Sequence, residues 1–489
     1  MSLFRPSHER VGVALIPTGG GAALLFATLR GLGVGAHLAT VLSIAVLIVS
    51  AAMVARRLPS SLDGVLRRRP AVAILWFALG LASIGATVRL ATFMVDETRA
   101  TRSIYPFDDF FVHHSCLSAH FQSAQLQRDG VANVYERTHY EGADGAPKFL
   151  NSFVIDVFLY PPPMLLLSRS GLALSDDFGR WRAVWFGFEG AIVALSLLAV
   201  VGWIGGVRGQ RAALLAPLVW LSIPTLLTLQ IGNVHLVAIA AAMLAMLAFE
   251  RGRHVVGGAT LGALMLIKIF PGILLLVLLF QRRWRSVAWT AGFAVAILVV
   301  AVIILGREPF AALFSYQLPR LASGAAFESI FAHPDAIAAN QSVYAVVQKL
   351  SLLGVPGMST GTAVAVSWAY TIALVALAAV GARGSHERLP RVLVWLALLQ
   401  LASLRSPFTP DTYALFGVLW ILVLLLASHE GRSKRVIGFA TLMVLANLVV
   451  PTVPIVPIQL LLGITLVHQL VFFGLCCWVV VASRRGSPL

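Results

Sequence analysis

The chain has 489 residues, of which 58% are hydrophobic and only 12% are charged, and its formal net charge is +16. Soluble proteins carry about 25% charged residues, so this composition excludes an ordinary soluble protein and predicts an all-α membrane protein with several spans. The positive charge does not indicate nucleic-acid binding, because the arginines form short clusters between apolar runs, as in the cytoplasmic loops of membrane proteins. These clusters are Arg56–Arg57, Arg67–Arg69, Arg251–Arg253, Arg282–Arg285, Arg383–Arg391, Arg432–Arg435 and Arg484–Arg485.

Apolar runs long enough for membrane spans follow one another along the chain, since a span needs about 20 residues. The first two predict an N-terminal two-helix extension, residues 1–70, and the third begins the main membrane domain, residues 71–489. Because basic clusters mark the cytoplasmic side, both termini are expected in the cytoplasm, and the third span is expected to end at the extracytoplasmic face. Spans are expected over Val11–Leu29, His37–Ala55, Ala71–Val95, Ala183–Ile204, Ala212–Gln230, Val234–Phe249, Ser286–Leu305, Gly361–Ala382, Val392–Leu404, Tyr413–Ala427, Val436–Val450 and Ile455–Val481.

Two apolar runs do not fit this alternation. Tyr160–Leu174 is short and begins with Tyr-Pro-Pro-Pro, so we interpret it as a helix that dips into the membrane from the extracytoplasmic face. His254–Phe280 has basic clusters at both ends and Pro271 inside it, where proline removes a backbone donor and favours a break. We therefore expect a hairpin of two short helices with Lys268 near its tip.

The acidic loop, residues 96–160, resembles neither a span nor a short connector. It holds nine of the chain's 21 acidic residues against five basic ones, so its charge is opposite to that of the whole chain. At its centre is the sequence Tyr105-Pro-Phe-Asp-Asp-Phe-Phe-Val-His-His114. An acidic loop with aromatic and histidine neighbours between apolar runs predicts a reaction chamber at the membrane surface.

Two further segments are expected on the same extracytoplasmic side. One is a second long loop, residues 306–360, and the other is the tight turn Arg405–Asp411. We expect both to converge with the acidic loop and the Lys268 tip on one face. Their polar residues that could contact a ligand are His333, Asn340, Gln341 and Arg405.

Lys268 is one of only four lysines and lies inside an apolar run. A charge at mid-bilayer costs about 2.5–3.5 kcal/mol, so such residues usually face a cavity and a partner, and an anionic phosphate is the partner we favour. The alternative is a lysine that extends to the interface from a helix end. Gln230 and Asn233, at the junction of two spans, could form a turn or hydrogen-bond a polar ligand.

Asp108 and Asp109 could cap the helix that follows, or one of them could act as a general base toward a hydroxyl. A metal site is not expected at His113 and His114, because adjacent helical side chains point in different directions and no partner stands four residues away. The three cysteines give no disulfide framework or zinc spacing either. Nucleotide-binding glycine motifs are also missing, so an enzyme of this kind needs a donor carried in the membrane itself.

Six short elements occur in a fixed order: Asp109-Phe-Phe-Val112, Tyr160-Pro-Pro162, Gln230–Asn233, Lys268–Pro271, Asn340-Gln-Ser342 and Ser406-Pro407. With them, residues 71–489 resemble the polyprenyl-phosphate-dependent glycosyltransferases of the type C fold, and most closely glycosyltransferase family 87. The resemblance implies that fold with about 12–14 transmembrane helices. Asp109 matches the family's catalytic aspartate better than Asp108, because only Asp109 has valine three residues on. Two departures are His113, where the family often has tyrosine, and the missing tryptophan after Pro407.

The resemblance implies an inverting hexosyltransferase of the bacterial plasma membrane, with its active site on the extracytoplasmic side. It would move a sugar, mannose in bacterial members of the family, from a polyprenyl-phosphate donor to a hydroxyl of a lipid or glycan acceptor. Its partners would be donor, acceptor and membrane lipids, with no metal or other cofactor. Asp109 would be the general base, and Lys268 and Arg405 would bind the donor phosphate. Contacts with donor or acceptor are expected from Asp108, His113, Tyr160, Gln230, Asn233, His333, Asn340 and Gln341.

Two other functions fit parts of the pattern. A transporter or lipid flippase accounts equally well for a buried lysine and broken helices, although it does not explain a single long acidic loop. A polymerase or ligase that joins preassembled lipid-linked glycans is the third interpretation.

Overall fold

The computed structural model describes residues 8–57, 70–142, 145–384, 387–428, 434–448 and 456–484. In these ranges seven helices are long and apolar enough to cross a membrane, or eight if the bent pair α9–α10 is one span. This confirms the predicted all-α polytopic membrane protein. Seven shorter apolar helices accompany them, and the predicted 12–14 crossings stay a prediction that requires some of these also to cross. The seven long helices are α1 (His8–Gly31), α2 (Ala36–Arg57), α4 (Pro70–Val95), α8 (Phe178–Ile204), α14 (Trp284–Leu305), α20 (Thr360–Ala382) and α25 (Ile458–Arg484).

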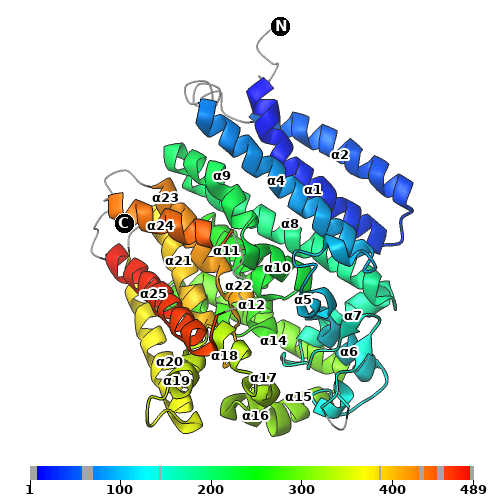
Figure 1. The fold of residues 1–489 in the computed structure, drawn as a ribbon, viewed down its shortest axis with the longest axis vertical. Coiled ribbons are helices and arrows are strands. Elements are labelled where there is room, and N and C mark those ends of the chain that lie inside the picture. The colour runs from blue at the N-terminus through cyan, green and yellow to red at the C-terminus, as the bar shows by residue number, and fades with distance from the viewer. Residues whose placement is uncertain are drawn as a thin grey trace.

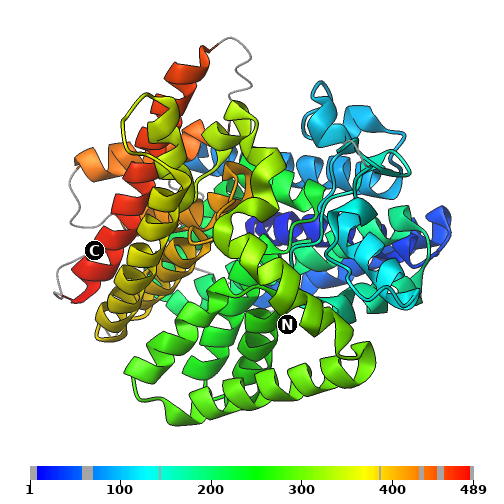
Figure 2. The ribbon, with the colours of Figure 1, turned by 90° about the horizontal axis from the view of Figure 1, so that it is seen from below.

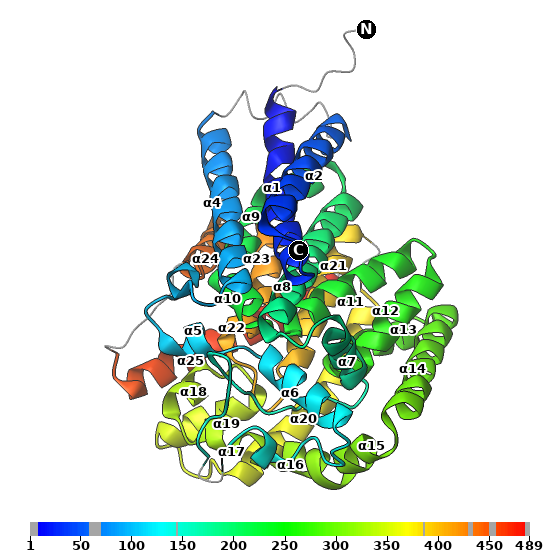
Figure 3. The ribbon, with the colours of Figure 1, turned by 90° about the vertical axis from the view of Figure 1, so that its right-hand side faces the viewer.

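The N-terminal helices form a layer on one side of the molecule (Figures 1 and 3). Helix α1 packs against α2, α4 and α8. The contact with α8 is close, because a Cβ added at Gly31 would lie 2.6 Å from the Arg180 carbonyl oxygen. On their outer faces these helices expose large apolar side chains such as Ile48 and Ile74, as expected for lipid contact. The division into residues 1–70 and 71–489 stays a prediction.

The centre of the molecule is filled by α11 (His235–Glu250), α21 (Arg388–Ser403) and α23 (Phe416–Ala427), whose residues are almost all buried. Their sequences are apolar on every face, which suits helices surrounded by other helices. Trp395 and Trp420 are the largest of the fully buried side chains. Helix α25 packs on α21, and α24 (Lys434–Ala446) packs on α23.

Two expected spans are broken. The run predicted as Ala212–Gln230 consists of α9 (Gly206–Trp220) and α10 (Ile223–Ile231), which meet at 57°. The bend follows from the extended backbone of Ser222 and from Pro224 in the first turn of α10. The run predicted as Tyr413–Ala427 is likewise divided between α22 (Asp411–Ala414) and α23. Parts of the spans predicted over 436–450 and 455–481 lie outside the described residues.

The predicted hairpin around Lys268 is confirmed. Helix α12 (His254–Ile267) ends where Lys268 adopts extended backbone angles, and η3 (Phe270–Gly272) leads into α13 (Ile273–Phe280). Helix α12 packs on α11 and α14, whereas α13 packs on α20 and α21. An ion pair of 2.5 Å between Arg283 and Glu250 brings the end of α13 close to the start of α12. Both ends of the hairpin therefore lie together, and Lys268 lies at the turn.

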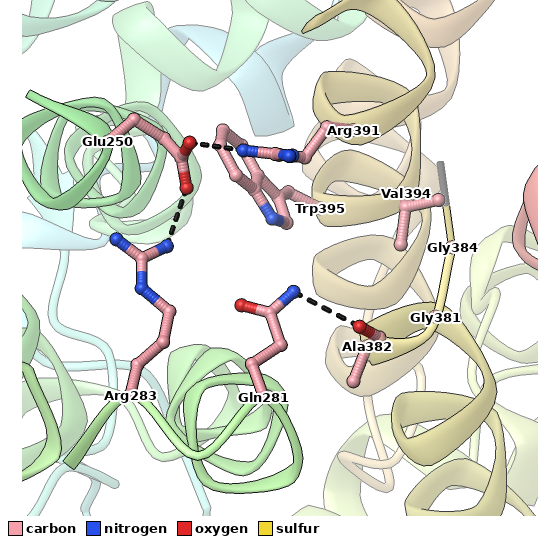
Figure 4. Close-up of a pocket in the computed structure, with 9 residues that line it drawn as sticks. All are labelled: Glu250, Gln281, Arg283, Gly381, Ala382, Gly384, Arg391, Val394 and Trp395. Carbon is pink, nitrogen blue, oxygen red and sulfur yellow. Dashed lines mark hydrogen bonds and ion pairs between the residues drawn. The ribbon is translucent and has the colours of Figure 1, made fainter. Parts of the chain in front are cut away.

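Three of the basic clusters meet at one end of the bundle. Glu250, at the end of α11 and next to Arg251–Arg253, pairs with both Arg283, just before α14, and Arg391, in the first turn of α21. Nearby, Arg208 pairs with Glu387. The Glu250 network borders a cavity of about 360 Å³ whose walls also include Gln281 and Trp395 (Figure 4). The clusters Arg251–Arg253, Arg282–Arg285 and Arg383–Arg391 thus lie together, as the predicted topology requires of them, and the positions of the other clusters stay a prediction; Arg67–Arg69, Arg432 and Arg485 lie outside the described residues.

The two long loops lie at another end of the bundle, below the N-terminal helices in Figure 3, and Figure 2 shows the acidic loop on the side opposite the C-terminal helices. The acidic loop and the short run after it contain η1 (Ala100–Arg102), α5 (Asp109–His113), α6 (Leu117–Arg128), η2 (Arg137–His139), the antiparallel strands β1 (Phe149–Leu150) and β2 (Phe153–Val154), and α7 (Met164–Leu174). With 11 residues α7 is too short to cross. Loop 306–360 contains α15 (Glu308–Ala312), η4 (Leu313–Gln317), α16 (Leu318–Ser323), η5 (Ala325–Phe327), α17 (Glu328–Phe331), α18 (Pro334–Ala339) and α19 (Val343–Leu352).

Replacing Glu250 with alanine should destabilise the protein by about 1–3 kcal/mol, because it leaves the mostly buried Arg283 and Arg391 without their shared carboxylate. Thermal unfolding of purified protein in detergent measures the effect. The control is Glu308→Ala at the exposed Arg307–Glu308 pair, which should change stability by no more than about 0.5 kcal/mol. Equal shifts in the two variants would contradict a structural role for the Glu250 network.

Candidate functional site

Lys268 is the centre of the candidate site. Its Nζ donates a hydrogen bond of 3.2 Å to Asn233 Oδ1. It also lies 5.5 Å from the Tyr160 ring and 5.4 Å from the Tyr413 ring, within the range of a cation–π contact. Among the described residues no carboxylate forms an ion pair with it. The charge is therefore held by one neutral oxygen and two aromatic faces, and it is available to an anion.

Three buried polar side chains near Lys268 have polar atoms without a hydrogen-bond partner in the described part of the chain. They are both ring nitrogens of His120, Nε2 of His235 and both carboxylate oxygens of Glu189. The His120 ring lies 4.5 Å from that of Tyr160, and the His235 ring lies 5.0 Å from that of Tyr413. Buried polar groups are rarely left unpaired in native proteins. Similar unpaired atoms occur elsewhere in the described chain, but these five could hydrogen-bond a polar ligand beside Lys268.

The turn after α10 connects Lys268 to the acidic loop. Gly232 ends α10 with a φ of +71°, and a Cβ there would lie 2.7 Å from the Leu117 side chain, so the turn needs glycine. The next residue, Asn233, accepts from Lys268 Nζ through Oδ1 and donates from Nδ2 to Cys116 Sγ at 3.3 Å. Asn233 thus holds the lysine on one side and the acidic loop on the other.

Gln230 fixes the acidic loop at two points. Its Oε1 accepts from the Ile104 amide at 2.6 Å, and its Nε2 donates to the Phe111 carbonyl at 2.8 Å. These bonds lie on either side of Asp108 and Asp109. Both polar groups of Gln230 are engaged with backbone, which favours the turn-forming interpretation over ligand binding for this residue.

The two aspartates of the acidic loop have different environments. Asp108 caps α5 by accepting from the Phe110 amide at 3.0 Å, as one of the sequence interpretations proposed. Asp109 is the first residue of α5, and its side chain is exposed, with no hydrogen bond or ion pair to the described residues. The carboxylate of Asp109 is therefore free to accept a proton. The ring of the neighbouring Phe110 stacks on the His114 ring, with 4.6 Å between the ring centroids, and so connects α5 to the His114 side chain.

A cluster of three side chains lies beside Asn233: His114, Cys116 and Asp156. His114 Nδ1 is 3.5 Å from Asp156 Oδ1, and His114 Nε2 is 3.6 Å from Cys116 Sγ. Burial raises the pKa of the Asp156 carboxyl, an effect that the nearby His114 opposes, and burial also raises the pKa of the Cys116 thiol. Sequence spacing did not single out this cluster, because Asp156 is 40 residues from Cys116.

The acidic loop is folded back on itself by specific contacts that hold this cluster together. A backbone bridge pairs His114 with Val154. Ser118 Oγ donates to the Val154 carbonyl and accepts from the Asp156 amide, both at 3.0 Å. The Cys116 amide donates to the Ile231 carbonyl at 2.8 Å. Strand β2, the start of α6 and the α10 turn are thereby fixed relative to each other.

The remaining predicted residues have other contacts. His113 Nδ1 lies 2.9 Å from the Ser152 carbonyl oxygen at the loop surface, and His333 is exposed at the start of α18. Arg405 donates to Thr371 Oγ1 at 2.6 Å and lies over the Trp368 ring at 5.2 Å, so it faces α20. No contact among the described residues joins His333 or Arg405 to Lys268. The structure therefore brings Tyr160 and Asn233, but not Arg405, to the lysine.

Asn340 and Gln341 connect the second loop to the Arg405–Asp411 turn. Asn340 Nδ2 donates to the Pro407 carbonyl at 2.9 Å, and its Oδ1 accepts from the Thr409 amide at 2.9 Å. The Gln341 amide donates to the Thr409 carbonyl at 2.8 Å. Lys268 contacts Tyr413 of α22, the helix that follows this turn. Contacts therefore join the acidic loop to Lys268 and the second loop to the turn, with Asn340 acting as a scaffold, and the convergence of all four segments on one face stays a prediction.

Comparison with known protein families decides between the candidate functions. The model of glycosyltransferase family 87 matches residues 158–407, more than half of the 489 residues. The chain belongs to glycosyltransferase family 87. No curated protein and no solved structure matches it significantly.

This family 87 member is accordingly a membrane glycosyltransferase, and a transporter or flippase is no longer needed to explain the buried lysine. The matched segment includes Tyr160, Asn233 and Lys268. Asp109 and the cluster of His114, Cys116 and Asp156 come before it. The lysine side of the site therefore lies within the matched segment, and the acidic loop before it is connected to that side by the contacts of Gln230 and Asn233.

Replacing Gln230 with leucine should free the acidic loop while leaving Lys268 in place, because it removes both hydrogen bonds to the loop backbone. Amide hydrogen exchange of residues 104–112 should become faster, and the rate of glycosyl transfer should decrease. The control is Gln122→Leu on α6, a partly exposed position, where exchange in 104–112 should be unchanged. Unaltered exchange in the Gln230 variant would show that this residue does not position the loop.

Proposed function

We propose that this glycosyltransferase transfers a hexose, with mannose the first candidate, from a polyprenyl-phosphate donor to a hydroxyl group of a lipid or glycan acceptor. The observation that carries the proposal is Lys268, a cation at a helix break that no carboxylate of the described chain neutralises by an ion pair. A lipid-linked donor places its phosphate at the membrane boundary, where such a cation can meet it. Phosphate is then both the group recognised and the leaving group.

The proposed reaction is a single displacement. The acceptor oxygen forms a bond to the anomeric carbon while the bond from that carbon to the phosphate oxygen breaks, which inverts the configuration. The acceptor proton passes to Asp109, and the bonding electrons leave with the polyprenyl phosphate. The carboxylate of Asp109 suits this role because it is exposed and does not have to leave an ion pair with a described residue before it accepts a proton.

Lys268 supports the departure of the phosphate. Negative charge grows on the leaving oxygen in the transition state, and an ammonium already in place stabilises that charge without reorganisation. Removing one such donor from an active site typically costs about 2.7–4 kcal/mol in transition-state stabilisation. Asn233 orients the ammonium through its 3.2 Å hydrogen bond.

The sugar ring is proposed to lie among the polar groups around Lys268. Tyr160 and Tyr413 offer aromatic faces, which suit the apolar faces of a hexose. His120, His235 and Glu189 offer unpaired hydrogen-bonding atoms, which suit its hydroxyls. Arg405 remains a proposed ligand of the donor phosphate, which it can reach only after leaving Thr371. Asn340 and Gln341 remain proposed ligands of donor or acceptor.

We place this reaction on the extracytoplasmic side of a bacterial plasma membrane. Support comes from three basic clusters that meet around Glu250, because basic residues are typical of the cytoplasmic side. The Lys268 turn is at the other end of the α12–α13 hairpin from that network. A donor presented outside the cytoplasm, where nucleotide sugars are not supplied, must be carried by the lipid.

Replacing Lys268 with methionine should lower transfer from radiolabelled polyprenyl-phosphate mannose by about 10²–10³-fold, because the ammonium beside the leaving phosphate is lost. The assay follows release of polyprenyl phosphate and formation of a new glycoside with a panel of acceptors. Lys148→Met is the control, since Lys148 donates to a loop carbonyl at the surface and its loss should not change transfer. A Lys268→Met protein with full activity would contradict the assignment of the phosphate site.

Replacing Asp109 with asparagine should reduce the rate of transfer by about 10²–10⁴-fold, the usual effect of removing a general base. Binding of the donor should be retained, because Asp109 makes no contact with Lys268. Donor binding is measured as the increase in unfolding temperature that the donor causes. Asp129→Asn, another exposed aspartate of the acidic loop, should transfer normally; equal activity in the two variants would reject Asp109 as the base.

A further inference from the structure

His114, Cys116 and Asp156 bring three metal-binding donor types to one point. One ring nitrogen, the thiol sulfur and one carboxylate oxygen all lie within 4.8 Å of one another. They come from the end of α5, the start of α6 and the segment after β2, which are far apart in the sequence but fixed by backbone contacts. We propose that these three side chains bind a zinc ion beside Lys268.

The distances suit tetrahedral zinc. With Zn–S of about 2.3 Å and Zn–N of about 2.0–2.1 Å, tetrahedral ligands place sulfur and nitrogen about 3.6 Å apart. The separation of Cys116 Sγ and His114 Nε2 is 3.6 Å. That pair already has the separation that binding needs. The Asp156 carboxylate, which now lies 3.5 Å from Nδ1 of the same ring, has to move toward the ion at Nε2, and the donor atoms start within 4.8 Å of one another. A mixed set of thiolate, imidazole and carboxylate ligands suits zinc, which lies between hard and soft metals.

The surroundings supply the supports that metal ligands usually have. Asn233 Nδ2 donates to Cys116 Sγ at 3.3 Å, which stabilises negative charge on the sulfur. The Phe110 ring stacks on His114 with 17° between the planes and sets the orientation of the imidazole. The Asp156 amide is held by Ser118 Oγ. Replacing one such partner of a metal ligand commonly lowers the affinity for the metal by about 10–100-fold.

The charge balance also favours a divalent ion. A thiolate and a carboxylate together carry two negative charges, so zinc makes the cluster neutral. A neutral cluster does not repel Lys268, which Asn233 joins to Cys116. Without a metal, the carboxylate of Asp156 has the His114 imidazole at 3.5 Å as its one ion-pair partner among the described residues, and that imidazole is charged only when protonated.

Three protein ligands leave a fourth coordination position open, which is typical of zinc sites that bind a substrate. Asn233 joins Cys116 to Lys268, so the open position lies close to the proposed phosphate site. We infer that it takes an anionic oxygen of the donor phosphate. This role rests on the proposed function, whereas metal binding itself does not.

The test is cobalt binding to the purified full-length protein in detergent after chelator treatment. One Co²⁺ per chain should produce a sulfur-to-cobalt charge-transfer band in the near ultraviolet together with the visible bands of four-coordinate cobalt, and one equivalent of Zn²⁺ should remove both. Cys116→Ser should abolish the charge-transfer band. His114→Ala and Asp156→Asn should weaken binding at least about tenfold.

Two controls match the variants in residue type. Cys477→Ser, in α25, and His113→Ala, next to His114 but turned to Ser152, should retain the full spectrum. A second measurement does not depend on folding of a variant: bound zinc should protect Cys116 of the wild-type protein from alkylation, as detected by peptide mass. A missing band, a band that survives in Cys116→Ser, or alkylation that zinc does not slow would each overturn the site.

Transfer assays separate the metal site from the proposed function. If zinc lies at the phosphate, the chelated enzyme should lose transfer at least about tenfold and regain it with one equivalent of zinc, as expected for loss of one transition-state contact. Cobalt binding with chelator-insensitive transfer would overturn the phosphate contact alone. Failure of polyprenyl-phosphate sugars as donors, with cobalt bound as expected, would overturn the proposed function and leave the metal site in place.

Discussion

The candidate site depends on a lysine held at a break between two helices of the membrane domain. A charge in such surroundings is unfavourable unless something offsets it, and within the described chain Lys268 has one amide oxygen and two aromatic rings as close partners. A full ion pair would stabilise the lysine better but would also occupy it. The incomplete pairing is what makes Lys268 suitable for binding an anion that comes and goes.

The other features of the site follow from the need to place the acidic loop over that cation. Asn233 contacts Lys268 and Cys116 at once, and Gln230 fixes the loop backbone around Asp109. Gly232 allows the turn between them to lie against Leu117. The proposed base and the proposed phosphate ligand thus belong to separate elements, α5 and the α12–α13 hairpin, which one polar turn holds together.

Much of this arrangement could be predicted from the sequence, because a few residues have strong local effects. Pro271 and the arginines at both ends of the run predicted the hairpin and the position of Lys268, and the order of six short elements predicted the family. The direction of Arg405 could not be predicted, since it depends on Thr371 and Trp368 of another helix. The bend at Ser222 was missed because its flanking residues are apolar enough to continue a span.

The cluster of His114, Cys116 and Asp156 shows a second limit of sequence reasoning. Metal sites are recognised in sequences by regular spacing, but here the third donor arrives through the β1–β2 hairpin and the Ser118 hydrogen bonds. The same holds for His120 and His235, which lie in α6 and α11 and each pack against a tyrosine ring that Lys268 contacts. Long-range contacts of this kind are set by packing, which periodicity does not encode.

The most direct measurement is an experimental structure of the protein with polyprenyl phosphate bound, obtained by cryo-electron microscopy. The account predicts a phosphate oxygen within hydrogen-bonding distance, about 3 Å, of Lys268 Nζ, between the rings of Tyr160 and Tyr413. A phosphate seated instead in the Arg283–Arg391 cavity at the Glu250 end, with Lys268 untouched, would contradict it.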